Sequence, residues 1–276
     1  MQSQNSLNLS NGIFFKLKSS FKKLYKNSNF YEKRISKTFD NNFEYKPSPH
    51  LLSSIIKYQK KKYKIEDFAT EAIWENNISS KDFKKLNNFF WFFSLDLKSS
   101  KETTQSIILN WINKNEKFDE DIWEFNITAK RIIAWLSNHQ LTYEDSNEEY
   151  RLFFNHMLQK QTNHLLNEIK NLSEIEEKLI GCAAIILTGL AYKDEKNYLD
   201  SGLNILKNII KQSLDKQGFP RSRSIQNLVF YLKYLIIIRE WFKESQNTIP
   251  EYIDETIYYL GSSYAFMWQN IKQDIF

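Results

Sequence analysis

Residues 174–191, EIEEKLIGCAAIILTGLA, decide the fold of this chain. The segment opens with acidic residues and continues beyond Lys178 as an uncharged, mostly apolar run. Small residues, among them Gly181, Ala184 and Gly189, recur along that run. A helix that is apolar all round is buried, and small side chains let its neighbours approach closely. The sequence therefore predicts a central helix here with several other helices packed against it.

Helical patterns continue in both directions from this segment. Trp123, Arg131 and Trp135 lie on one stripe of a helix that we expect after Asp119. The aromatic block FFWFF at 89–93 is apolar on all sides, which predicts burial between neighbouring helices. The predicted helices are a run from Ser80 through that block, then 102–113, the helix after Asp119, 147–172, 174–191, 197–214, 224–242 and a last one after Pro250.

Glycine and proline are scarce, with 6 and 4 copies in 276 residues. β-Sandwiches, barrels and propellers need a turn about every 8–12 residues, so this composition argues against them. Hydrophobic residues make up 42% and aromatic residues 16% of the chain, which is more than a disordered chain carries. We therefore expect an all-α protein built from antiparallel helical hairpins.

The N-terminal region has a basic, amphipathic pattern. Phe14, Leu17, Phe21 and Leu24 recur at helical spacing, and lysines between residues 16 and 26 fill the other face. We expect this helix to dock its apolar face on the rest of the protein with the lysines in water, and attachment to an anionic membrane is the alternative. The predicted division is a basic extension over 1–63 and a helical domain over 64–276.

Several classes of site and compartment are disfavoured by the composition. Cys182 is the only cysteine, so no intramolecular disulfide can form, and the four histidines include no HExxH motif and no pair at i, i+4. We expect no metal and no cofactor. The net charge of +5 accompanies no nucleic-acid recognition motif. The longest apolar stretch, 179–192, is too short to span a membrane, and no signal peptide is visible, which predicts a cytoplasmic protein.

The segment QGFPRSRSIQ at 217–226 is the most informative candidate site. It places Arg221 and Arg223 directly before a helix that Ser224 could cap. Paired guanidinium groups at a helix N-terminus favour an anion. The alternative is an ordinary turn whose arginines pair with nearby carboxylates.

These motifs, taken in order, resemble a known family. FWFFSLDL at 90–97, AKRIIAWL at 129–136, LTGLA at 187–191 and QGFPRSRS at 217–224 are similar to the N-terminal helical domain of bacterial heparinase II/III-like proteins. The resemblance covers about residue 64 to the end and implies an incomplete α/α toroid. In the family a β-sandwich follows this domain, and characterised relatives are polysaccharide lyases that cleave uronic-acid-containing chains by β-elimination. The resemblance also implies a periplasmic location as the alternative to the predicted cytoplasmic one.

The resemblance implies roles for particular residues. Arg221, Arg223 and Gln226 would neutralise the substrate carboxylate, and Tyr231 would act as base or acid, with neighbouring arginines lowering the pKa of its phenol. Tyr234 is the fallback for that role. The aromatic stripe, with Arg131 and Trp135, either lines a sugar-stacking groove or packs helices together.

The sequence also departs from the family pattern. The family's lyases carry an Asn-His pair at the start of the helix that here begins with the acidic run 174–177. Asn163 and His164 form such a pair, but they fall one helix too early. Many relatives have an aspartate before the loop glycine, where this chain has the neutral Gln217. The β-sandwich is absent from 1–276 and would have to be encoded elsewhere. We therefore expect a lyase-like helical domain that binds an anionic polysaccharide or oligosaccharide and is inactive alone. The alternative is a non-catalytic carbohydrate-binding or scaffold domain.

Overall fold

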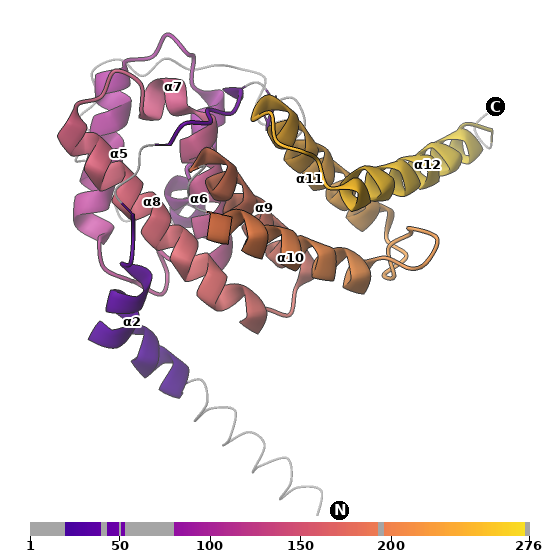
Figure 1. The fold of residues 1–276 in the computed structure, drawn as a ribbon, viewed down its shortest axis with the longest axis horizontal. Helices are drawn as coiled ribbons and strands as arrows, with labels where there is room; N and C mark the ends of the chain where they lie inside the picture. The colour runs from indigo at the N-terminus through magenta and orange to yellow at the C-terminus, as the bar shows by residue number, and fades with distance from the viewer. Residues whose placement is uncertain (1–19, 40–42, 50, 53–79, 193–195, 274–276) are drawn as a thin grey trace, which may run out of the picture.

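The computed structural model describes residues 20–39, 43–49, 51–52, 80–192 and 196–273, and every regular element in these ranges is a helix (Figure 1). The all-α prediction is therefore confirmed for this part of the chain. Residues 20–26 are helical. The elements that follow are α2 (Asn29–Ile35), α4 (Ser80–Asn87), η2 (Phe90–Ser94), α5 (Lys101–Asn115), α6 (Phe125–Ser137), α7 (His139–Thr142), α8 (Glu148–Glu168), η3 (Ile169–Asn171), α9 (Ile175–Ala191), α10 (Lys196–Ser213), α11 (Ile225–Glu244) and α12 (Glu251–Gln273).

Helix α9 lies at the centre and contacts α6, α8, α10 and α11 (Figure 1). Its small residues permit these contacts. A Cβ atom on Gly181 would lie 2.1 Å from the Phe125 ring of α6, and one on Gly189 would lie 2.4 Å from the backbone nitrogen of Leu199 in α10. Ala184 is also fully buried. The prediction of a central helix with close neighbours is confirmed.

The close approach of α9 and α10 makes Gly189→Ala a sensitive test of packing. The added methyl group meets backbone rather than a flexible side chain, so we expect the substitution to destabilise the protein by about 1–3 kcal/mol. Gly261 in α12 is the matched control, because a Cβ there meets nothing within 4 Å. Gly261→Ala is expected to stabilise the protein by about 0.5–1 kcal/mol through helix propensity. Urea denaturation midpoints of both variants measure the two effects, and equal shifts would contradict the packing.

Helix boundaries differ from the predicted ones at the aromatic residues. Helix α4 ends at Asn87, before the aromatic block, and Phe89 adopts a left-handed conformation with φ of 57°. This turn places the Phe89 ring edge-on against Trp111 and Trp135, with centroid distances of 6.0 and 5.3 Å. Trp123 likewise lies in the turn before α6 rather than on the helix. Packing of large rings between distant helices therefore overrides local helical periodicity.

The described part of the predicted N-terminal extension shares the core of the helical domain. Tyr31, Ile35, Phe43 and Tyr45 belong to the same hydrophobic core as α9. The Tyr31 hydroxyl hydrogen-bonds to Nδ1 of His164 in α8 at 2.6 Å. Residues 29–39 and 43–45 are therefore packed into the helical domain, against α8 among other elements. The predicted boundary at 63 and 64 lies outside the described residues.

The orientation of helix 20–26 is opposite to the expected one. Lys22 and Lys26 face the protein and pair with Glu168 at 2.9 and 2.7 Å. Phe21 and Leu24 are 68% and 69% exposed. The expectation that the apolar face docks is wrong for Phe21 and Leu24. Lys26 is mostly covered because Glu168 on α8 holds it, whereas Lys22 keeps part of its side chain in water although it contacts the same carboxylate. Phe14 and Leu17 lie outside the described residues.

Candidate functional site

The loop between α10 and α11 is organised by Asp215. One of its carboxylate oxygens accepts hydrogen bonds from the backbone nitrogens of Gln217 (2.9 Å) and Phe219 (3.0 Å). The backbone N–H of Phe219, then that of Gln217, and the charge of Arg223 hold the pKa of this carboxyl below its usual range, against the opposing effect of desolvation. Gly218 has φ of 76° and closes the turn. These bonds give the loop a fixed shape.

The two loop arginines have different environments. The Arg223 guanidinium pairs with Asp215 at 2.8 Å and lies 5.5 Å from the centroid of the Phe219 ring. Within the described residues, no hydrogen bond or ion pair engages the Arg221 guanidinium, which is exposed. The interpretation as an ordinary, carboxylate-paired turn therefore fits Arg223, and the anion-binding interpretation fits Arg221. Ser224 caps α11 by accepting a bond from the Asn227 nitrogen (3.2 Å), which confirms the predicted cap.

A hollow of about 280 Å³ lies beside this loop, against α12. Lys211, Lys216 and Arg221 line it and are all exposed. The ring of Tyr259, 44% exposed, forms part of its wall. Its other lining residues are Ile210, Leu214, Asp215, Gly218, Glu255 and Thr256. A hollow that combines an aromatic ring with three cations suits a ring-shaped ligand that carries negative charge, and of its two carboxylates Asp215 is already paired with Arg223.

Tyr231 lies on α11 facing the start of α9. Its side chain is buried, and its hydroxyl donates to a carboxylate oxygen of Glu176 at 3.1 Å. Burial, and then the charge of Glu176, raise the pKa of Tyr231 to about 12. This shift is opposite to the predicted one, because the phenol is buried and the neighbouring charge is a carboxylate rather than an arginine. Burial also raises the pKa of Tyr234.

The other predicted site residues are not brought to the loop hollow. Gln226 is exposed on the first turn of α11 and does not line it. Arg131 and Trp135 are fully buried in α6. Trp135 packs against Phe89, Trp111 and Phe154, at centroid distances of 5.3 to 5.5 Å. Arg131 and Trp135 were expected either to line a sugar-stacking groove or to pack helices together. Their burial supports packing, because a sugar could not reach either side chain.

A second hollow of about 690 Å³ contains residues that sequence reasoning missed. Glu244 at the end of α11 accepts bonds from the Tyr45 hydroxyl (2.7 Å) and the Ser48 nitrogen (3.0 Å). His139 of α7 lines the same hollow, with its Nε2 atom 3.3 Å from a carboxylate oxygen of Glu144. Burial lowers the pKa of His139, which disfavours protonation of its imidazole. Nothing local in the sequence signals this grouping, since its members come from three distant segments.

Among the described residues, no group of three or more His, Cys, Asp and Glu side chains is arranged to hold a metal ion. None of the described helices has the length and apolar character needed to cross a membrane. No family model matches the chain, and no curated protein and no solved structure matches it either. The geometry of the loop hollow is therefore the main guide to function.

Proposed function

We propose that this chain is a helical domain of the heparinase II/III-like kind that binds an anionic, uronic-acid-containing glycan without cleaving it alone. The observation that carries the proposal is the loop hollow, whose lining combines Lys211, Lys216 and Arg221 with the partly exposed ring of Tyr259. The apolar face of a pyranose ring would stack on the tyrosine, and its carboxylate would accept bonds from the cations. Asp215 supports this role because it fixes the loop that carries Arg221.

An incomplete α/α toroid is the arrangement that we propose for the helices. Consecutive helices pack on one another, as α9 does on α8 and α10 and as α12 does on α11. Short connections join α8 to α9 and α11 to α12. Two consecutive helices that are joined by a short connection and packed on each other form a helical hairpin. An α/α toroid is built from such hairpins, so these contacts support the proposal.

Binding should depend on Arg221 more than on surface charge in general. Arg221→Glu is expected to weaken binding of an acidic oligosaccharide about tenfold or more, because it replaces a donor in the hollow by a repelling carboxylate. Lys170→Glu is the matched control, since Lys170 is an exposed cation on η3 away from the hollow. Calorimetric titration with uronate oligosaccharides compares the variants with the unmodified chain. Equal losses would indicate unspecific attraction instead.

The chain alone is expected to give no β-elimination. A phenol with a pKa near 12 that already donates to Glu176 is a poor base at neutral pH, and the Glu176 carboxylate would repel a uronate. The test incubates the purified chain with alginate, heparan and related polymers and follows the ultraviolet absorbance of unsaturated products. Product formation that disappears with Tyr231→Phe would contradict the non-catalytic proposal.

A further inference from the structure

The outward-facing side chains of helix 20–26 and α2 form an unusual surface. Lys22 and Lys26 pair with Glu168, and Lys23 pairs with Glu120 at 3.0 Å. These three contacts fix the rotation of the helix with its lysines toward acidic partners on the protein. The opposite face of an amphipathic helix must then point away from the protein.

Three large apolar side chains of helix 20–26 and α2 are exposed: Phe21, Leu24 and Phe30. We call them the N-terminal apolar surface. The ring of Tyr25 in helix 20–26 contacts that of Phe30 in α2, with a centroid distance of 6.2 Å. Helix 20–26 and α2 lie at one end of the molecule, far from α12 (Figure 1). Large apolar side chains grouped on a surface in this way mark an interaction site.

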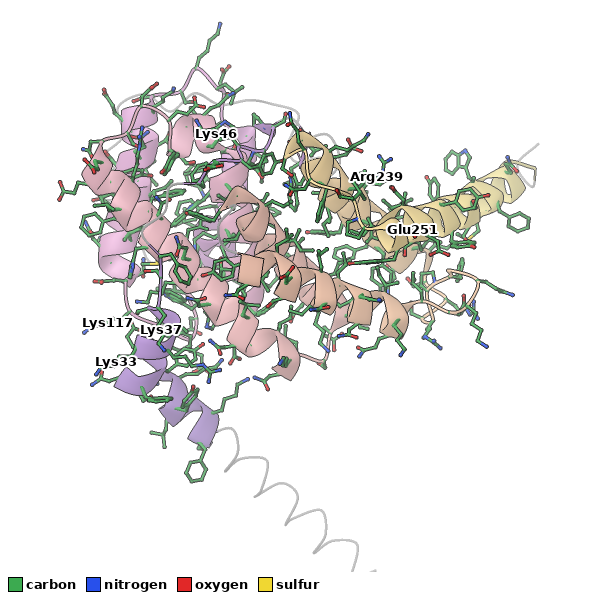
Figure 2. All side chains as sticks on the ribbon, viewed as in Figure 1. Lys33, Lys37, Lys46, Lys117, Arg239 and Glu251 are labelled. Atoms are coloured by element: carbon green, nitrogen blue, oxygen red, sulfur yellow. The ribbon has the colours of Figure 1, made fainter. Side chains whose placement is uncertain are left out.

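The segment of the sequence that carries this surface is basic. Residues 1–39 contain eight lysines and arginines and one acidic residue, a net charge of +7, whereas the whole chain has +5 and the remaining residues therefore −2. Lys33, Lys37 and Lys117 lie together around α2 (Figure 2). They are exposed, and within the described residues no ion pair engages them. Of the acidic groups nearby, Glu32, Glu120 and Glu168 are already paired with lysines. Glu116, Asp119 and Asp121 lie close to Lys117 in the sequence and offset part of its charge.

We propose that the N-terminal apolar surface docks on an anionic lipid bilayer, with Phe21, Leu24 and Phe30 inserted at the boundary between headgroups and acyl chains. An amphipathic helix with apolar residues on one face and lysines beside them binds such membranes through apolar burial and attraction to anionic lipids together. A second copy of the chain fits less well, because self-association through this surface would bring two segments of +7 together. The proposal is independent of the glycan site.

Vesicle sedimentation tests the docking. The full chain is expected to sediment with phosphatidylcholine vesicles that contain phosphatidylglycerol, and much less with phosphatidylcholine alone, and added salt should weaken binding. The double variant Phe21→Ser, Leu24→Ser should lose about tenfold or more in partitioning, because both removed side chains would leave the bilayer boundary. The control is Leu152→Ser, Phe153→Ser, which removes two exposed apolar residues from α8 and should bind as the unmodified chain does.

A labelled variant shows whether the surface itself meets lipid. The one native cysteine, Cys182, is buried, so a polarity-sensitive dye added to Leu24→Cys reports from that position. Its emission should shift to the blue on anionic vesicles, and that of labelled Leu152→Cys should not. Three results would overturn the proposal: no binding of the folded chain to anionic vesicles, equal binding of the Phe21→Ser, Leu24→Ser variant, or a dimer that this variant abolishes while vesicles bind nothing.

Discussion

Lowering the pH from 6.5 to 4.5 is expected to reduce the free energy of unfolding by about 2–3 kcal/mol through His164 alone. Burial, then the positive charge of Lys26, lowers the pKa of His164 to about 3 from an ordinary value of 6.5. The unfolded chain therefore binds the proton first. The stability that neutral His164 provides is fully present above pH 6.5 and is lost as the pH falls toward the folded-state pKa.

The local structure explains why a charged His164 is disfavoured. Its ring is buried between Phe118 and Trp123, and Nδ1 interacts with the Tyr31 hydroxyl. The neighbouring Glu168 carboxylate is not the cause between pH 6.5 and 4.5. The pKa of Glu168 is lowered by bonds from Lys26 and Lys22 although burial opposes this, so its contribution declines only below its ordinary value of 4.5.

Urea denaturation at several values between pH 7 and 4.5 measures the effect. The slope of the unfolding free energy against pH counts the protons that the chain takes up on unfolding. His164→Gln should lower that number by close to one, whatever its effect on stability at pH 7. Tyr31→Phe is the matched control, because it removes the hydroxyl and keeps the buried imidazole, so the slope should persist. His139 and His156 also have pKa values lowered by burial, so part of the slope remains in both variants. A stability that is constant over this range in the unmodified chain would contradict the burial of His164.

Arg131→Met is expected to destabilise the protein by about 3–5 kcal/mol, although Arg131 is far from the proposed site. The buried guanidinium donates to Oε1 of Gln161 (2.7 Å) and to the backbone carbonyl of Asn87 (2.8 Å), and it lies 4.0 Å from the centroid of the Trp111 ring. The same change leaves these acceptors buried without a donor.

Arg221→Met is the matched control for this prediction. Arg221 is exposed and donates no side-chain bond within the described residues, so we expect a change within about 0.5 kcal/mol. Thermal and urea unfolding of both variants, followed by circular dichroism, measures the difference. If Arg131→Met unfolds at the same midpoint as Arg221→Met, the buried hydrogen bonds of Arg131 contribute little to the stability of the protein.

The candidate site was partly visible in the sequence. The loop at 217–226, with its glycine, its arginines and the Ser224 cap, stands out because turn residues are rare in this chain. The selection of Arg221 over Arg223 was not visible, since it depends on which arginine Asp215 engages. The contribution of Tyr259 was also hidden, because it comes from α12, which reaches the loop only in the folded chain.

The sequence by itself determined the all-α fold, the central position of α9 and most helix ranges. Periodicity, small residues and scarce turn residues are local properties, and they act within a helix or between a helix and its immediate surroundings. The tertiary structure decided the break at Phe89, the burial of Arg131, the raised pKa of Tyr231 and the outward face of helix 20–26. Each of these depends on partners distant in the sequence, such as Glu168 for Lys26 and Glu176 for Tyr231, because packing and electrostatic contacts form between residues that only folding brings together.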